Sequence, residues 1–165
     1  MIHADLDDAD LRLLELLQLD ASLSQAQLAE RAGMSTTSCW RRIQRLEASG
    51  VIRRRVALLD PAALGLGVHV VVQVSLTEHS PRTARAFEAL VAKCPEVVEC
   101  YSMSGERDYM LRVIVRDIAA YDDFLTRTLL HHPVVASASS SFALRQIKYE
   151  TALPIGAPRA SRRGR

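Results

Sequence analysis

The chain has 165 residues, of which 48% are hydrophobic and 24% charged, with a formal net charge of +2. This composition is that of an ordinary globular protein and excludes a fibrous or intrinsically disordered chain. No apolar run approaches the roughly 18 residues that a bilayer-spanning helix needs, and the acidic residues 1–10 do not resemble a secretory signal, so we expect a cytoplasmic protein with no membrane partner.

Cysteine and histidine give no sign of a cofactor or a metal site. Cys39, Cys94 and Cys100 are odd in number and lack paired spacing, so buried free thiols are expected. His131 and His132 lie where a helix is expected to end, and they more simply complement its negative end than bind a metal. We predict no cofactor and no metal.

The basic residues are concentrated in two short stretches. Residues 1–30 carry one Arg against seven acids, residues 31–55 carry seven Arg against one acid, residues 56–155 carry nine bases against eleven acids, and residues 156–165 carry four Arg. Clustered Arg is typical of a phosphate-binding surface, although a charge cluster by itself is more often a solvated face.

The first fifty residues predict three helices. Asp7 is a candidate cap for a first helix that ends near Asp20. Ser24 and Gln27 form a capping box for a second helix, and Gly33 is its expected stop.

The third predicted helix has a capped start and two distinct stripes. Ser35 follows the turn 32–35 closely enough to cap a helix that runs to about residue 50, which is the arrangement of a helix-turn-helix. Three apolar residues at spacings of four and three form its core stripe: Cys39, Ile43 and Leu46. The other stripe is polar and basic: Thr37, Arg41 and Arg45, flanked by Ser38 and Arg42.

After the third helix, residues 51–59 form a β-prone run with Arg53, Arg54 and Arg55 at its centre, which fits the wing of a winged helix. The alternative is a structural helical hairpin with a solvated Arg face. We favour DNA binding because groove insertion requires the capped turn, the hydroxyl residues at the helix start and the Arg residues beyond them together.

These features assign contacts to double-stranded DNA. Residues near the N-terminus of the helix lie nearest the bases, and the candidates for base contact are Thr36, Thr37, Ser38 and Arg41. The capping residue Ser35 is also counted among the DNA-binding residues. The remaining arginines are expected to bind phosphates: Arg42, Arg45, Arg53 and Arg55. Trp40 lies between the two faces and is expected to pack beneath the helix rather than to contact a base.

The rest of the chain predicts a βαββαβ domain of ferredoxin-like fold. Its strands are expected at residues 68–77, 97–103, 109–115 and 135–144, and its helices at 81–93 and 118–131. Val71 and Ile114 lie on the sheet face that these helices do not cover, so we expect a second copy of the chain to supply the missing layer. The fold class is α+β, with domains at 1–55, 68–153, a linker at 56–67 and a disordered basic tail at 154–165.

Short motifs extend through both domains: Leu6-Asp7-x-x-Asp10, Ser35-Thr36-Thr37-Ser38-Cys39, Arg45-Leu46-Glu47, Gly50-Val51-Ile52, Leu59-Asp60-Pro61, Gly105-Glu106-Arg107-Asp108-Tyr109, and Ser140-Ser141-Phe142 up to Pro154. With them the chain resembles the leucine-responsive and asparagine-responsive (Lrp/AsnC) family of transcription regulators. The resemblance implies a winged-helix DNA-binding domain, an amino-acid-sensing domain, dimers that associate into octamers, and control of amino-acid metabolism genes. Arg54 and Arg55 depart from the Gly and Tyr common in the family, and Ser38 from its frequent Pro.

The resemblance also points to an effector site at the turn 105–108. Gly105 permits a positive φ that leaves amides free to donate to a carboxylate, and Asp108 or Glu106 can accept from an α-ammonium group. Without the resemblance this would be a polar hairpin turn. The residues expected to bind the effector are Ser104, Gly105, Glu106, Asp108, Tyr109, Ser140 and Ser141.

Three other functions remain as alternatives. An enzyme is disfavoured because no nucleophile and base set, phosphate-binding Gly loop or metal cluster is recognisable. An RNA-binding sheet is disfavoured because the central strands hold only Tyr101 and Tyr109 as aromatic residues. A purely structural scaffold is the third alternative, which loss of DNA binding with retained assembly would separate from a regulator.

Overall fold

The computed structural model describes residues 5–155, which form two units. One unit contains the residues up to Leu58 together with the segment from Lys148 onward, and the other contains Leu59–Ile147. Residues 148–153, expected in the second domain, are therefore grouped with the N-terminal helices. The expected disordered tail lies outside the described residues from position 156 onward.

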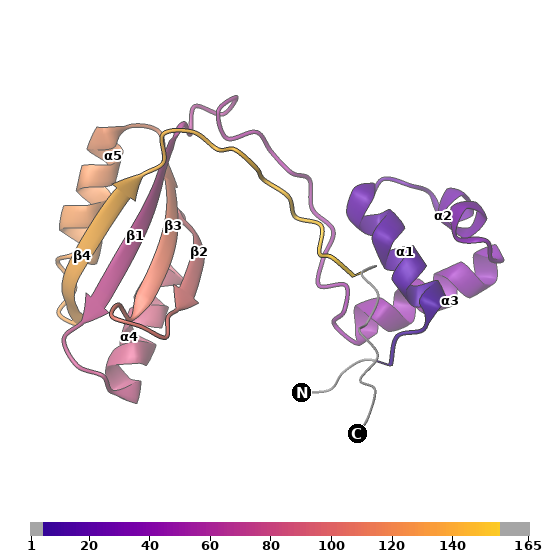
Figure 1. Ribbon diagram of the computed structural model, residues 1–165, viewed down its shortest axis with the longest axis horizontal. Helices are drawn as coiled ribbons and strands as arrows, with labels where there is room; N and C mark the ends of the chain where they lie inside the picture. The colour runs from indigo at the N-terminus through magenta and orange to yellow at the C-terminus, as the bar shows by residue number, and fades with distance from the viewer. Residues whose placement is uncertain (1–4, 156–165) are drawn as a thin grey trace, which may run out of the picture. The chain divides into compact units, whose positions relative to one another are not determined.

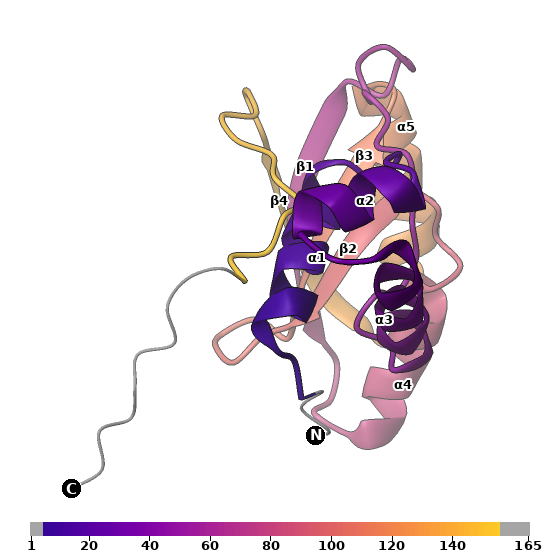
Figure 2. The same ribbon diagram turned by 90° about the vertical axis from the view of Figure 1, so that its right-hand side faces the viewer.

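Figure 2 shows the three helices of the N-terminal unit, and a side-chain cap starts each of them. Helix α1 spans Asp8–Leu19, α2 spans Gln25–Ala32 and α3 spans Thr36–Ala48. Asp7, Ser24 and Ser35 accept hydrogen bonds from the backbone three residues later, which satisfies N–H groups that a helix start otherwise leaves unpaired. The three predicted helices and their caps are confirmed.

Gly33 makes the turn between α2 and α3. Its φ of 68° is left-handed, a conformation that costs glycine little because it lacks a Cβ atom. The amide of Met34 closes the turn by donating to the carbonyl of Ala29 at 2.9 Å. A small apolar core joins the helices: Leu13, Leu23, Leu28, Ala29, Ala32, Cys39 and Ile43. The predicted helix-turn-helix is confirmed.

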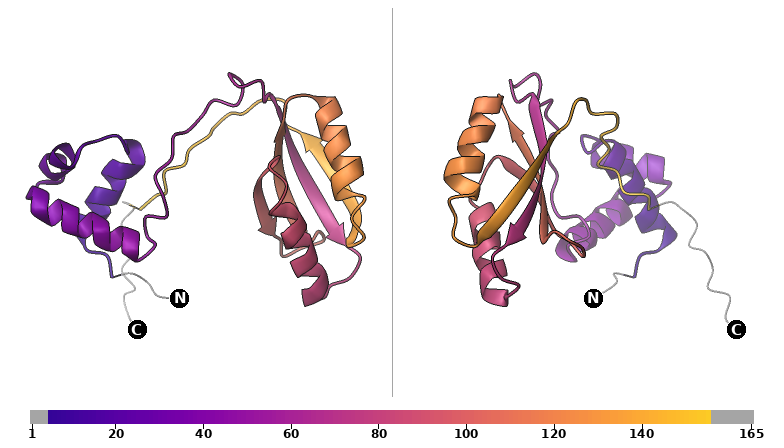
Figure 3. Two further views of the ribbon diagram at one scale, coloured as in Figure 1. Left: turned by 180° about the vertical axis from the view of Figure 1, so that it is seen from behind. Right: turned by 60° about the vertical axis from the view of Figure 1, so that its left-hand side comes forward.

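The segment expected to form a wing has no strand. Residues 53–60 are extended, but no β-ladder is present anywhere between α3 and residue 68. An extended segment becomes a strand only when a neighbour exchanges hydrogen bonds with it. The segment from Lys148 runs alongside it in Figures 1 and 3, but no β-ladder joins the two among the described residues. The expected wing strand at 51–59 is therefore wrong for this structure.

The second unit is a four-stranded antiparallel sheet with helices on one side (Figures 1 and 3). Its elements in chain order are β1 Val68–Leu76, α4 Pro81–Val91, β2 Val97–Ser102, β3 Tyr109–Val115, α5 Ile118–Asp123 with the π-helical continuation η1 Phe124–Leu129, and β4 Val135–Phe142. The strand order β2-β3-β1-β4 places β1 and β3 at the centre. This is the predicted ferredoxin-like βαββαβ arrangement.

Alternation along the central strands separates the two faces of the sheet. Side chains of the helix-covered face are fully buried, among them Val70, Val72, Leu111 and Val113. The next residue along β1, Val71, is 37% exposed on the opposite face. The sequence predicts this uncovered face, because the two helices can cover only one side of the sheet.

Two hydrogen bonds attach the C-terminal segment to α1. The Gln18 side chain accepts from the amide of Leu153 at 2.6 Å and donates to the carbonyl of the same residue at 3.2 Å. This pair of bonds holds Leu153 against the N-terminal unit, to which residues 148–155 belong.

Several smaller expectations can also be placed. Cys39 and Cys94 are buried, but Cys100 is exposed, so the expectation of three buried thiols is wrong for Cys100. Residues 5–155 contain no group of three His, Cys, Asp or Glu side chains arranged to hold a metal ion. Across the same residues, no helix has the length and apolarity needed to cross a membrane.

Candidate DNA-binding surface and effector site

Helix α3 begins with hydroxyl residues, one of which is used by the fold. The Ser35 hydroxyl accepts from the Ser38 amide at 3.2 Å and so fixes the first turn of the helix. Thr36 and Thr37 are exposed, and Ser38 is half-buried. The side chain of Ser35 therefore starts the helix, while Thr36 and Thr37 remain open to a partner.

Arg42 and Arg45 are bound to carboxylates at the start of α1. Arg42 Nη1 lies 2.7 Å from Asp7 and 2.8 Å from Asp10, and Arg45 Nη2 donates to the second oxygen of Asp10. Asp10 is fully buried, and a buried carboxylate is stable only when it is paired. The hydrogen bond from Arg42 lowers the pKa of Asp7, and those to Asp7 and Asp10 raise the pKa of Arg42. These two arginines brace α3 against α1.

Other arginines of the basic stretch are unengaged. Arg41, Arg53 and Arg54 are exposed, and their side chains have no hydrogen-bond or ion-pair partner among residues 5–155. Arg55 has a partner, but only a weakly held one: its Nη2 lies 2.9 Å from Glu47 in a pair that is exposed to solvent. Of the nine side chains predicted to bind DNA, Arg41 is the one that combines a position on α3 with a free guanidinium group.

Trp40 is not packed beneath the helix. Its side chain is 51% exposed, and it is absent from the apolar core of the N-terminal unit. The core positions of α3 are already filled by Cys39 and Ile43, and Trp40 lies about 100° around the helix from Cys39. The expectation that Trp40 packs beneath the helix is therefore wrong.

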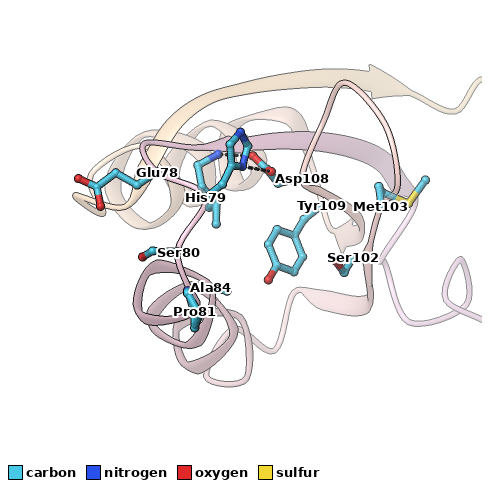
Figure 4. A pocket seen from close by; sticks show the side chains of 10 residues that line it. Glu78, His79, Ser80, Pro81, Ala84, Ser102, Met103, Asp108 and Tyr109 are labelled. Carbon is cyan, nitrogen blue, oxygen red and sulfur yellow. Dashed lines mark hydrogen bonds and ion pairs between the residues drawn. The ribbon is translucent and has the colours of Figure 1, made fainter.

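A hollow of about 260 Å³ lies in the second unit between the end of β1, the start of α4 and the β2–β3 turn (Figure 4). Ten residues line it: Leu76, Glu78, His79, Ser80, Pro81, Ala84, Ser102, Met103, Asp108 and Tyr109. In Figure 4 the Tyr109 ring lies between Ser80, Pro81 and Ala84 of the α4 start and Ser102 and Met103 of the turn. The lining combines apolar side chains with two carboxylates, those of Glu78 and Asp108.

Asp108 is the less exposed carboxylate of this hollow, and both of its oxygens have partners. Oδ2 accepts from the amide of Leu76 at 2.8 Å, which holds the end of β1. Oδ1 lies 2.9 Å from Nδ1 of His79, whose side chain is 82% exposed. Because His79 is so exposed, this contact is the one that an incoming group can replace without disturbing the fold.

Tyr109 is buried beside Asp108. Its hydroxyl donates to Glu88 of α4 at 3.1 Å, and its ring packs on Phe87 with the centroids 4.5 Å apart. Burial, together with that hydrogen bond and the negative charge of Glu88, raises its pKa to about 12. The phenol is thus a fixed, neutral wall of the hollow.

The other residues predicted for the effector site lie elsewhere. Ser104, Gly105 and Glu106 are exposed in the turn, and Gly105 does not adopt the positive φ that was expected of it. Ser140 faces the helices and shares a hydrogen bond with the Tyr121 hydroxyl, whereas Ser141 lies on the opposite face of β4. Neither serine lines the hollow. Ser140 and Ser141 pair with Val72 and Val71 of β1, whereas the hollow lies at the other end of that strand, near Leu76.

Most of the lining was missed by sequence reasoning, including the polar side chains of His79, Ser80 and Ser102. Ser80 followed by Pro81 was a recognisable helix start, since Ser caps and Pro is favoured in the first turn. The sequence does not show that this helix start lies close to the turn after Ser102, because their proximity depends on how α4 packs on the sheet.

Comparisons with known proteins agree with this architecture. The model of the Lrp/AsnC ligand binding domain matches residues 69–153, and that of a winged helix-turn-helix DNA-binding domain matches residues 6–53. The chain belongs to the Lrp/AsnC family. It is therefore a DNA-binding transcriptional regulator, with its helix-turn-helix in the N-terminal unit and the family's ligand-binding domain in the second.

Three Lrp/AsnC relatives illustrate the match. The DNA-binding transcriptional activator DecR of Escherichia coli K12 is 44% identical over 150 residues, which cover 91% of this chain and 99% of DecR. An AsnC family regulator from Agrobacterium tumefaciens has a TM-score of 0.86 at 49% identity, covering 91% of this chain and 97% of that one. A transcriptional regulator of Neisseria meningitidis, solved as a complex with L-Met, has a TM-score of 0.87 at 38% identity, covering 92% and 97%.

Proposed function

We propose that α3 enters the major groove of duplex DNA and reads bases with its exposed N-terminal half. Thr36, Thr37, Ser38 and Arg41 face the bases, while Arg53 and Arg55 of the following segment bind phosphates. Arg42 and Arg45 position the helix instead, because Asp7 and Asp10 already bind them. The free guanidinium group of Arg41 beside a capped hydroxyl start is the observation that supports this proposal. A protein that binds chromosomal DNA in this way works in the cytoplasm.

The second part of the proposal is that a free amino acid binds in the hollow beside Asp108. Its ammonium group replaces His79 on Oδ1 of Asp108, and its carboxylate lies toward the positive N-terminal end of α4. Leu76, Met103 and Tyr109 offer apolar surface to the side chain. The complex of the Neisseria meningitidis regulator with L-Met supports an amino acid as the effector class. Genes of amino-acid metabolism are the targets that we propose for a regulator with such an effector.

The hollow is tested with two variants that change different contacts. A thermal-shift screen of the twenty amino acids selects the probe, since a ligand at 100 times its Kd stabilises a protein by about 2.7 kcal/mol. Asp108→Asn keeps an acceptor for the Leu76 amide but removes the negative charge, so calorimetry should show at least a tenfold loss of affinity. His79→Ala frees Oδ1 and should tighten binding. Equal affinity in all three proteins places the effector elsewhere.

The third part is that the chain forms a homodimer through the open face of the sheet, and that dimers assemble further into octamers. Val71 and Ile114 give this face its apolar character, and burying it requires a second layer that the chain does not itself supply. Effector binding then acts by favouring one assembly over another, because a ligand with equal affinity for both shifts neither.

Light scattering on the full chain tests the assembly. Val71→Asp places a charge in the proposed interface and should lower the mass toward that of the monomer. Ile118→Asp is the matched control, because it makes the same kind of change at an exposed apolar residue that starts α5, in the helix layer rather than on the open face. This control should leave the mass unchanged. A wild-type monomer, or an unchanged mass in Val71→Asp, contradicts the proposed dimer.

A further inference from the structure

Trp40 is the single large apolar side chain that α3 exposes. It is also the only Trp in the chain, and half of its surface is open. Its indole N–H has no hydrogen-bond partner among residues 5–155. An aromatic side chain of this size is normally buried, so its exposure on this helix requires an explanation.

The side chains around Trp40 are those of the proposed DNA-binding surface. Thr37, Arg41 and Gln44 are exposed on the side of α3 that is turned away from the core. Trp40 is three residues from Thr37 and four from Gln44, so it neighbours both on the helix surface, and Arg41 follows about 100° further around the helix. The core of the N-terminal unit is complete without it.

The chemistry of the major groove identifies what an indole can meet there. Each base edge presents hydrogen-bond donors and acceptors, and the C5-methyl group of thymine is the apolar group among them. Arg41 suits the O6 and N7 acceptors of guanine, whereas the apolar ring of Trp40 suits a methyl group.

We propose that Trp40 is a specificity-determining residue that packs on the C5-methyl group of a thymine next to the base pair read by Arg41. The inference rests on the proposed insertion of α3 into the major groove and adds a second base preference to it. The contact carries no charge, so it contributes to sequence preference without releasing counterions from the duplex.

A methyl deletion on the DNA tests the contact. The probe is the duplex that the full-length wild-type protein enriches from a randomised pool, with each thymine replaced in turn by deoxyuridine. For one thymine, fluorescence anisotropy should show about a fourfold loss of wild-type affinity, the value of one buried methyl group. Trp40→Ala should bind the unmodified duplex about tenfold more weakly and be insensitive to the same replacement, as a double-mutant cycle requires.

Controls separate this contact from a general one. Leu19→Ala removes another exposed apolar side chain of the same unit and should change neither affinity nor deoxyuridine sensitivity. Trp40→Ala should keep the wild-type salt slope, whereas Arg53→Ala, which removes a proposed phosphate contact, should lower it by about 0.9. Because Trp40 is the only Trp, its fluorescence also reports directly, and the selected duplex should protect it from acrylamide quenching.

Three results overturn the inference alone: Trp40 stays open to acrylamide in the bound complex, no deoxyuridine distinguishes wild type from Trp40→Ala, or Trp40→Ala weakens selected and scrambled duplexes equally. A change in the mass of Trp40→Ala by light scattering also overturns it, because the indole would then belong to a protein interface. A wild-type protein that enriches no sequence at all contradicts the proposed function itself and this inference with it.

Discussion

The arginines on one side of α3 are paired with carboxylates, whereas the arginine on its other side is unpaired within the part of the chain that the structure describes. On the side facing α1, Arg42 and Arg45 are bound by Asp10, a carboxylate that is fully buried. On the open side, Arg41 has no side-chain partner among residues 5–155. A basic cluster is therefore not a uniform phosphate-binding surface, because carboxylates on a neighbouring helix decide which of its members are available.

The largest change in stability should come from removing Asp10, the carboxylate that Arg42 and Arg45 share. Asp10→Ala removes this shared carboxylate, but Arg42 keeps Asp7 and Arg45 is partly exposed. The free energy of unfolding in urea should therefore fall by about 2 kcal/mol, the usual contribution of a hydrogen bond to a charged group. Asp8→Ala removes an exposed carboxylate from the same helical turn and should cost far less. Equal losses in the two variants would mean that Asp10 does not brace α3.

Acid should weaken the ion pair between Asp7 and Arg42, and with it the stability of the N-terminal unit, in a defined pH range. The pKa of Asp7 is held below its ordinary value of 3.8 by the hydrogen bond from Arg42, so its contribution to stability is present above pH 3.8 and is lost as the pH falls through the lowered pKa. Asp7→Asn keeps an N-cap acceptor but not the charge. Urea unfolding should show a stability gap from wild type at pH 7 that closes below pH 3.8. A gap that is the same at both pH values would contradict the ion pair.

The smallest effect is expected where an arginine is engaged only at the surface. Glu47→Ala releases Arg55 from an exposed pair, which should change stability by about 0.5 kcal/mol or less. The freed Arg55 should make DNA binding more salt-dependent, by up to about 0.9 in slope. Glu30→Ala removes another exposed glutamate of this unit and should leave the slope unchanged. A rise of the same size in Glu30→Ala would mean that the loss of negative charge, and not the release of Arg55, changes the slope.

Features that depend on neighbouring residues were predictable from the sequence. The three helices of the N-terminal unit follow from caps such as Ser24 and Ser35, whose bonds span three residues. The order of strands and helices in the second unit follows from hydrophobic alternation. Asp108 and Tyr109, two of the residues expected at the effector site, both line the hollow. Each of these depends on short-range geometry.

Features that depend on distant partners were not predictable. Asp10 meets Arg42 and Arg45 across 32 and 35 residues, and no local pattern of the sequence marks that pairing. The expected wing strand is absent because β propensity alone does not make a strand, and these residues form no ladder with another segment among the described residues. Trp40 was misplaced because an amphipathic position does not show whether the core has room for it.

The central claim is that Arg41 contacts the bases of DNA, whereas Arg42 stabilises the fold by binding carboxylates of α1. The most direct test compares the binding of Arg41→Ala and Arg42→Ala to the duplex selected by wild type and to a scrambled duplex, with urea unfolding of both. Arg41→Ala should weaken binding to the selected duplex and reduce sequence preference with stability unchanged, whereas Arg42→Ala should lower stability and keep the wild-type sequence preference. Sequence preference that is lost in Arg42→Ala and kept in Arg41→Ala would contradict the account.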